Sequence, residues 1–299
     1  AEYLKIIIVW FLALTFARRQ ELIETYDYQA LTKRKWFPRK WSDLKDWRVY
    51  SLVMILLVAA QPDLGNAAII VLTALIMYSV SGVGYRWFSA ILATVTALSA
   101  AFLGLIAVVG VKTMEKVPVF GYVAKRFSAF FNPFDDLTGS GHQLAHSYYA
   151  MSNGGWFGRG LGNSIEKAGY LPEATTDFVF SIAIEELGLI GAGLILALLF
   201  FLILRIMHVG IKAKNPFNSM IALGIGGMVL MQTFVNIGGI SGLIPSTGVT
   251  FPFLSQGGNS LLVLSVAIGF VLNIDANEKR EEIIREAEEG LKAKEITQE

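Results

Sequence analysis

Asp177 is the residue of this chain most suited to acid–base chemistry, because it stands immediately before the longest apolar stretch. A carboxylate at the start of a long apolar helix lies where water meets lipid, and there it can take a proton from a substrate hydroxyl. Lys167 and Arg159 precede it and would bring positive charge to an anionic leaving group. A simpler alternative is that Thr175, Thr176 or Asp177 caps the N-terminus of the helix. The sequence leaves both roles open.

The pKa of Asp177 is subject to two opposing effects. The positive end of the helix dipole lowers the pKa of a carboxyl group at a helix N-terminus. Partial burial raises it, because removal from water disfavours the charged form. The sequence does not decide which effect prevails.

Two further acids, Glu185 and Glu186, lie inside the apolar stretch, roughly 12 Å beyond Asp177 at 1.5 Å per residue. Ionisable side chains within a membrane span are costly and usually face the protein interior, where they commonly mark functional sites. A structural ion pair with a cation on a neighbouring helix would explain them equally well. Glu186 is therefore a candidate substrate-binding residue.

The segment 153–162 is rich in glycine and contains Arg159. Glycines allow backbone N–H groups to converge on an anion, and an arginine beside them suits a phosphate. A flexible turn is an equally good interpretation of the same composition. The segment is not a dinucleotide-binding fingerprint, because no strand–helix–strand pattern surrounds it.

His142 and His146 are four residues apart and could share one face of a helix as metal ligands. A zinc site needs three or four ligands. The third histidine, His208, is far away in the sequence, and the chain has no cysteine. We therefore predict no metal site here, and the absence of cysteine also excludes disulfides and thiolate nucleophiles.

The composition requires a membrane environment around these residues. Apolar residues make up 54% of the 299 residues and charged residues only 16%, whereas soluble domains are about 45–50% apolar and about 25% charged. The net charge of +1 gives no indication of nucleic-acid binding. The chain starts with Ala1, and no basic region or cleavage site precedes its first apolar stretch, so we expect a truncated start rather than a signal peptide.

Seven apolar stretches approach the roughly 20 residues that a helix needs to cross a bilayer. They are 3–17, 49–60, 67–81, 88–111, 178–207, 220–237 and 260–274. The sequence therefore predicts an all-α, multi-pass transmembrane bundle. Lys and Arg are concentrated in 18–47, which places that segment in the cytoplasm.

Alternation of the spans then puts two long connections, 112–177 and 238–259, on the outer side. The first is too long for a simple connector and is rich in aromatic residues, so it should fold against the membrane face. The second is apolar but interrupted by Gly and Pro, which predicts a re-entrant wall around a site. We expect a membrane-embedded core over 1–274 and a charged cytoplasmic tail, helical or disordered, over 275–299.

Three motifs in order, 61–65 (Gln-Pro-Asp-Leu-Gly), 167–186 and 245–260, closely resemble the SEDS family of FtsW, RodA and SpoVE. The resemblance extends to about Asp275, and the spelling of residues 167–172 looks more like the FtsW branch than the RodA branch. Family members have ten spans, so the resemblance implies that this chain holds the last seven. The start of the chain, 2–5, is similar to the entry of the family's fourth span.

The resemblance implies a peptidoglycan glycosyltransferase that polymerises lipid II at the outer face of the cytoplasmic membrane during septal cell-wall synthesis. The aspartate of the Thr-Asp-Phe element, here Asp177, would be the general base. Further positions implied to bind substrate are Arg159, Lys167, Glu173, Glu186, Ser246, Ser255, Gln256 and Asn259. Thr176 stands where many members have His, and Gln256 and Asn259 replace the commoner Tyr and Ser, which affects the fine tuning of the site.

The implied partners are lipid II, a class B penicillin-binding transpeptidase, other divisome proteins and membrane lipid, with no nucleic acid. The sugar bond changes from α to β, so a single displacement with one base is sufficient. The diphosphate that leaves needs cations, either Arg159 and Lys167 or a divalent ion such as Mg²⁺ or Mn²⁺. Two alternatives are a flippase for the lipid-linked precursor and a non-catalytic scaffold for the transpeptidase.

Overall fold

A computed structural model describes residues 1–25, 47–59, 61, 63–81, 118–139 and 141–298, with isolated positions at 89, 92–93, 96–97 and 104. Every regular element within these residues is a helix, which confirms the predicted all-α class. The elements are α1 (Glu2–Thr25), α3 (Trp47–Ala59), α4 (Leu64–Val80), α7 (Pro118–Phe131), α8 (His142–Gly154), the 3₁₀ helix η2 (Glu166–Ala168), α9 (Val179–Lys212), α10 (Pro216–Ile240) and α11 (Gly258–Gln298).

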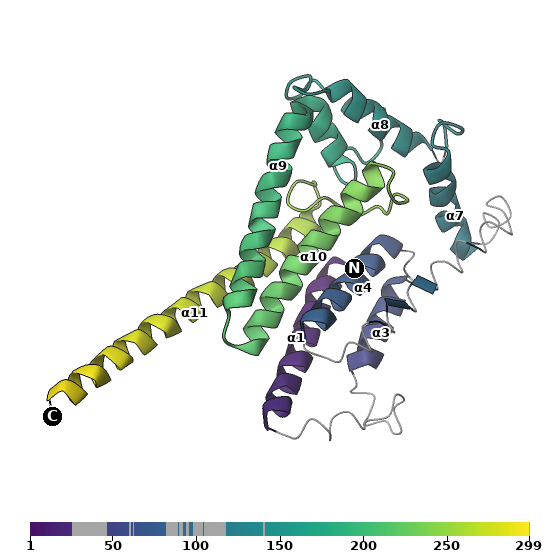
Figure 1. The fold of residues 1–299 in the computed structure, drawn as a ribbon. Helices are drawn as coiled ribbons and strands as arrows, with labels where there is room; N and C mark the ends of the chain where they lie inside the picture. Colours follow the sequence, from purple (N-terminus) through teal and green to yellow (C-terminus); the bar gives the residue numbers. More distant parts are fainter. Residues whose placement is uncertain are drawn as a thin grey trace.

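Helix α10 lies at the centre of the bundle, where α9, α4, α1 and α11 pack around it (Figure 1). Small residues on α10 make this possible, because they let helix backbones approach closely in a membrane protein. A methyl group built on Gly224 would lie 2.7 Å from Val9 Cγ1 of α1 and 2.9 Å from Met77 Sδ of α4. Gly224 therefore allows α1 and α4 to pack closely against the same position of α10.

A buried polar contact also joins α1 to α10. Lys5 is 1% exposed, and its Nζ donates to Glu2 Oε1 at 2.8 Å and to Gln232 Oε1 at 3.1 Å. Gln232 Nε2 in turn donates to the carbonyl of Thr250 at 3.0 Å. A buried charge is tolerated when it is paired and hydrogen-bonded, so this contact ties the loop after α10 to the first helix.

In the part of the chain that the structure describes, three helices are long and apolar enough to cross a bilayer: α9, α10 and residues 258–290 of α11; Gly65–Val80 is a shorter apolar helix. This confirms the predicted spans 178–207, 220–237 and 260–274. Predicted spans 3–17, 49–60 and 67–81 form α1, α3 and α4. Predicted span 88–111 lies outside the described residues, apart from the isolated positions.

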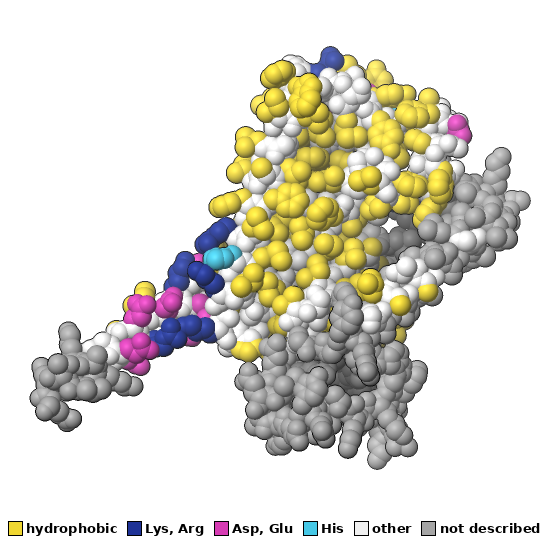
Figure 2. Space-filling view, viewed as in Figure 1, with side chains coloured by type: hydrophobic (Ala, Val, Ile, Leu, Met, Phe, Trp, Pro, Cys, Tyr) yellow, Lys and Arg dark blue, Asp and Glu magenta, His cyan; other side chains and the backbone are white. Residues whose placement is uncertain are grey.

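The surface of the bundle is apolar where a soluble protein would be polar. Figure 2 shows hydrophobic side chains over most of the body, with Lys, Arg, Asp and Glu gathered where α11 leaves it. On α9 the exposed large apolar residues are Leu189, Ile190, Leu194, Leu198, Phe201 and Leu204. An apolar surface of this extent is in contact with lipid rather than water. The chain is a membrane protein.

The non-helical stretch after α10 is shorter than predicted. Helix α10 continues through Ile240 and α11 begins at Gly258, so residues 241–257, rather than 238–259, are irregular. The chain reverses at the end of α10, where the N–H groups of Leu243 and Ile244 both donate to the carbonyl of Gly238. Gly242 supports the reversal with a φ of 70°, which favours glycine.

Helix α11 passes through the predicted boundary at 274/275 without a break and projects from the bundle (Figure 1). Its exposed part carries ion pairs four residues apart, Lys279 with Asp275 at 2.6 Å and Arg285 with Glu289 at 3.9 Å. This confirms the solvated-helix interpretation of the tail. At the other basic segment, α1 extends to Thr25, and residues 26–46 lie outside the described residues.

Candidate active site

Asp177 lies in the turn that leads into α9, but it does not cap that helix. The N-cap position is Phe178, and no side-chain hydrogen bond caps the helix there, so the capping alternative is wrong. Instead, Asn236 of α10 holds the backbone at Asp177: its Nδ2 donates to the carbonyls of Asp177 at 2.7 Å and Val249 at 2.6 Å. The Asp177 carboxylate is therefore not used to start α9.

The irregular loop 241–257 also holds this turn, through hydrogen bonds to its backbone. Ser255 Oγ donates to the carbonyl of Thr176 at 2.6 Å, and the N–H of Gln256 donates to the carbonyl of Thr175 at 2.8 Å. Phe251 stacks on Phe180 of α9 with ring centroids 4.7 Å apart. The backbone that carries Asp177 is thus fixed between α10 and the loop, which holds the carboxylate in one place.

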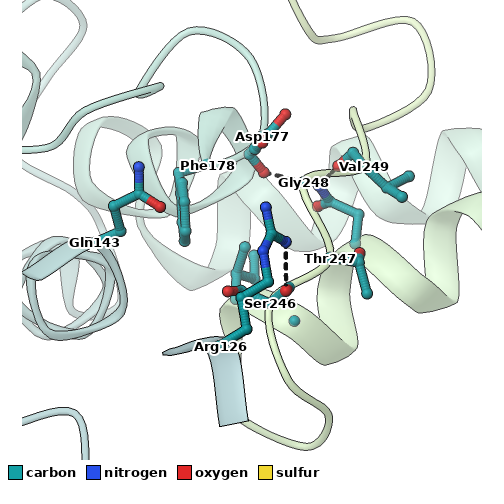
Figure 3. Close-up of a pocket in the computed structure, with 11 residues that line it drawn as sticks. Arg126, Gln143, Asp177, Phe178, Ser246, Thr247, Gly248 and Val249 are labelled. Atoms are coloured by element: carbon teal, nitrogen blue, oxygen red, sulfur yellow. Dashed lines mark hydrogen bonds between the residues drawn. The ribbon is translucent and has the colours of Figure 1, made fainter. Parts of the chain in front are cut away.

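Asp177 lines a void of about 290 Å³ that is open to solvent. The pocket is lined by Arg126 of α7, Gln143 of α8, Asn236 of α10 and residues 246–249 of the irregular loop, and Figure 3 shows Arg126 beside Ser246. Arg126 Nη1 donates to the carbonyl of Ser246. The pocket therefore joins three parts of the chain that are far apart in sequence, and it places one base beside one cation.

The environment of Asp177 raises its pKa from 3.8 to about 6. Burial is the largest cause, and the carboxylate of Glu173 adds to it; the guanidinium of Arg126 acts in the opposite direction, and Asp63 raises the pKa slightly further. Asp63 belongs to the turn before α4, where it accepts a hydrogen bond from the N–H of Asn66. Burial thus prevails, and a carboxyl group with this pKa is well matched to proton transfer near neutral pH.

The predicted site residues separate into three groups. Ser246 lines the pocket with Asp177, and Glu173 acts on it electrostatically from an exposed position with φ 57°. Ser255 and Gln256 hold the backbone. The remaining four, which do not line the pocket, are Arg159, Lys167, Glu186 and Asn259.

Arg126, Gln143 and Asn236 line the pocket and were missed by the sequence analysis. A polar amide within an apolar span is a recognisable signal, because such residues face the protein interior, and Asn236 could have been found by it. Arg126 carries no comparable signal, since an arginine in a long polar connection between apolar runs is ordinary.

Glu185 has a structural role that neither sequence interpretation anticipated. Its carboxylate, fully buried, accepts hydrogen bonds from the Ser164 hydroxyl, from the N–H of Ile165 at 3.0 Å and from the N–H of Glu166 at 3.4 Å. Asn153 Nδ2 lies at 3.5 Å. The acid thus anchors the segment between α8 and α9 onto α9. Glu186 differs: it forms an ion pair with half-exposed Lys167 at 3.6 Å.

Replacing Glu185 with leucine is expected to destabilise the protein by at least about 3 kcal/mol, because the hydroxyl of Ser164 and the N–H groups of Ile165 and Glu166 would lose their shared charged acceptor. Glu186→Gln is the matched control. It removes one ion pair to a half-exposed lysine, which contributes at most about 1 kcal/mol. Thermal unfolding of both variants in detergent measures the difference, and equal losses would contradict the anchoring role of Glu185.

The glycine-rich segment crosses α9 at a kink. Gly188 has φ 71° and ψ 176°, which interrupts the helix, and the N–H groups of Arg159 and Gly160 donate to the carbonyls of Glu185 and Glu186, both at 2.9 Å. In return, the N–H of Leu189 donates to the carbonyl of Gly155 at 2.9 Å. These N–H groups are used in hydrogen bonds to the backbone of α9 and do not point at an anion. Arg159 itself is exposed.

The two histidines are adjacent in α8, with ring centroids 4.3 Å apart, and His146 Nδ1 lies 2.6 Å from Glu166 Oε2. This contact joins α8 to η2. Among the described residues no three His, Asp or Glu side chains come together as metal ligands. At the pocket, a divalent cation would find one carboxylate, Asp177, beside the guanidinium of Arg126.

Comparison with known proteins gives a consistent result. The family model FtsW/RodA/SpoVE, described as "Cell cycle protein", matches residues 1–280. The "Probable peptidoglycan glycosyltransferase FtsW" of Lactococcus lactis subsp. lactis (strain IL1403) is 52% identical over 283 residues, which cover 95% of this chain and 67% of that protein. The protein of the same name from Bacillus subtilis (strain 168) is 36% identical over 301 residues, covering 99% of this chain and 70% of that protein.

A solved structure has the same fold. It is described as "Structural coordination of polymerization and crosslinking by a peptidoglycan synthase complex", and one of its chains matches 89% of this chain and 68% of its own length with a TM-score of 0.60 and 24% identity. The family model spans nearly all of the chain, and the sequence relatives are far above chance similarity over most of its length. The chain therefore belongs to the FtsW/RodA/SpoVE family.

Proposed function

We propose that this chain is the catalytic part of a peptidoglycan glycosyltransferase that polymerises lipid II at the outer face of the cytoplasmic membrane. The observation that carries the proposal is the position of Asp177, a carboxyl group with a pKa of about 6 in a solvent-open pocket at one end of an apolar helix bundle. Relatives named peptidoglycan glycosyltransferase support the reaction class. Their FtsW name supports a role in septal cell-wall synthesis.

In the proposed reaction, Asp177 is the general base. It takes the proton from the attacking sugar hydroxyl, the oxygen of that hydroxyl forms a bond to the anomeric carbon of the second sugar, and the bond from that carbon to the diphosphate breaks. The electron pair leaves with the lipid-linked diphosphate. Inversion at the anomeric carbon needs no second carboxylate as nucleophile, which fits a pocket with one aspartate.

Lys167 and Arg159, which do not line the pocket of Asp177, remain the proposed contacts of the diphosphate. Both residues are exposed and lie on the outer loop that Glu185 anchors to α9. Exposed cations near the lipid surface can meet a headgroup diphosphate while the lipid tail stays in the bilayer. Glu173, Ser246, Ser255, Gln256 and Asn259 are proposed to shape the surrounding surface.

A class B penicillin-binding transpeptidase is the proposed partner, together with other divisome proteins. The solved complex with the same fold is described as coordinating polymerization and crosslinking. Crosslinking is a transpeptidase reaction, and a polymerase of this fold would work beside the enzyme that performs it. We extend this pairing to the present chain.

The rate of polymerisation is expected to rise with pH through an apparent pKa of about 6, because Asp177 must be ionised to accept a proton. Below that pH the base is protonated and inactive. Initial rates between pH 5 and pH 8.5, measured with saturating lipid II, check this expectation. An acid limb near pH 4 would mean that burial does not set the ionisation of the base.

The test of the proposed function is synthesis of glycan strands from purified lipid II by the chain together with its transpeptidase partner. Wild type is expected to give polymer, and Asp177→Asn is expected to give none. Movement of labelled lipid II across vesicle membranes without polymer would favour a flippase. Normal polymer from a folded Asp177→Asn variant would leave this chain as a scaffold for another polymerase.

A further inference from the structure

Arg126 and Asp177 flank the same point of the pocket, although they come from different elements. A methyl group built on Gly248 would lie 2.9 Å from Arg126 Nη2 and 3.4 Å from Asp177 Oδ2. Figure 3 shows the Arg126 side chain directed toward Asp177 and the backbone at Gly248. The absence of a side chain at Gly248 thus leaves the space in which the cation and the carboxylate approach each other.

The position of the guanidinium is fixed by the loop that also fixes the base. Arg126 Nη1 donates to the carbonyl of Ser246, and the same loop accepts the Asn236 amide at Val249. Asn236 also holds the carbonyl of Asp177. Residues 246–249 therefore set both partners relative to one another, and the planar, permanently charged arginine side chain suits a fixed electrostatic role.

Without Arg126, the charged side chains that act on Asp177 would all be negative. Glu173 acts from the turn before α9 and Asp63 from the turn before α4, and both raise the pKa of Asp177 in the same direction as burial. Helix α10 contributes the neutral amide of Asn236, and the loop contributes the Ser246 carbonyl. Arg126 is the group that lowers the pKa of Asp177 against these effects.

We propose that Arg126 is a positioning residue for the reaction: its guanidinium keeps the Asp177 carboxylate ionised and turned toward the pocket, ready to accept the proton of the attacking hydroxyl. The proposal rests on the proposed function and adds a residue that the sequence does not mark. The proposal assigns two different roles to the cations. Arg126 stabilises the carboxylate of the base, and Lys167 and Arg159 bind the diphosphate.

The test compares pH–rate profiles of Arg126→Gln and wild type. An opposite charge within about 4–6 Å shifts the pKa of a carboxyl group by about 1 unit or more. The acid limb of Arg126→Gln is therefore expected to move up by about 1 unit, which lowers the rate about fivefold at pH 6 and leaves it near the wild-type rate at pH 8. Arg126→Lys is expected to return the acid limb most of the way to its wild-type pH. A loss of rate that is equal at all pH values, or an unshifted limb, would overturn the proposal.

Lys125→Gln is the matched control, because it removes the same charge from the adjacent, exposed residue of α7. Its acid limb is expected to stay at the wild-type position. Arg126→Met, which keeps the length of the side chain, replaces Arg126→Gln if the latter does not fold. A limb that moves as far with Lys125→Gln would show a general charge effect and refute the role of Arg126.

A second readout does not depend on activity. Unfolding temperatures are measured for two proteins that differ only by Asp177→Asn. The difference between their unfolding temperatures changes with pH as Asp177 ionises. In the Arg126→Gln background the midpoint of this difference is expected at higher pH than in wild type. An unmoved midpoint overturns the proposal. A moved midpoint in a protein that makes no polymer would instead identify the proposed function as the part that fails.

Discussion

Asp177→Asn is expected to abolish polymerisation and, above pH 6, to make the folded protein more stable. The rate should fall roughly 10²- to 10⁴-fold, the range that a positioned general base contributes. Asparagine has nearly the same shape but cannot accept the proton. The backbone contacts of Asp177 with Asn236 do not involve its side chain, so the variant should keep the fold.

The gain in stability follows from the raised pKa. The folded state prefers the protonated carboxyl group, so the contribution of Asp177 to stability is highest below pH 3.8, falls as the pH rises to about 6, and stays at the lower level above that pH. A shift of this size is equivalent to about 3 kcal/mol, which partial exposure of the side chain reduces to about 2 kcal/mol. Asparagine avoids that cost because it carries no charge.

Thermal unfolding of wild type and Asp177→Asn at pH 5 and pH 8 measures the effect. The variant should unfold at a higher temperature than wild type at pH 8, and the difference should be about half as large at pH 5, which lies between the unfolded and folded pKa values of Asp177. Glu173→Gln is a useful control, because it should narrow the difference at pH 8 by removing one negative neighbour. Equal stability of wild type and Asp177→Asn at both pH values would contradict a carboxylate held at a raised pKa.

Much of the fold could be predicted from the sequence because membrane helices carry their signal locally. An apolar run longer than the bilayer is thick has few alternatives to a spanning helix, and α9, α10 and α11 agree with the runs that predict them. The residues at which the helices end were less predictable from the sequence. Gly238 and Gly239 break helices in water-soluble proteins, but here they lie in the last turns of α10, where loop residues 243–247 pack against them.

The candidate site could be predicted only in part, because its geometry depends on contacts between distant segments. Asp177 was found because it adjoins an apolar run. Arg126 and Ser246 meet across 120 positions of the chain, and no local pattern marks that contact. Ser255 acts through its contact with the carbonyl of Thr176, and sequence reasoning assigns chemistry to side chains more readily than it assigns backbone support.

The glycine-rich segment 153–162 shows the same limit. Its composition fits a phosphate nest, a flexible turn or a close backbone crossing, and the sequence alone does not distinguish the three. The partner that decides is Gly188, which lies beyond Asp177 inside α9. The segment replaces the hydrogen bonds that the kink removes from the helix, so its glycines serve close approach of two backbones.

Gly188→Ala is expected to destabilise the protein by more than about 3 kcal/mol. The backbone at Gly188 lies in a region that is essentially restricted to glycine, with φ 71° and ψ 176°, and such strain costs about 1–3 kcal/mol for another residue. A methyl group there would also lie 2.3 Å from the carbonyl oxygen of Trp156 and 2.4 Å from the nitrogen of Gly158. Neither backbone atom can move away without breaking the crossing.

Gly193→Ala is the matched control in the same helix, because a methyl group at that position meets nothing within 4 Å. Alanine is the better helix former there, so this variant should be neutral or stabilised by up to about 1 kcal/mol. Thermal unfolding gives the difference in stability, and trypsin cleavage after exposed Arg159 reports on the crossing itself. Gly188→Ala should be cleaved faster at that bond under native conditions, because the segment loses its attachment to α9. Cleavage at the wild-type rate, with wild-type stability, would mean that the crossing does not hold the segment between α8 and α9 in place.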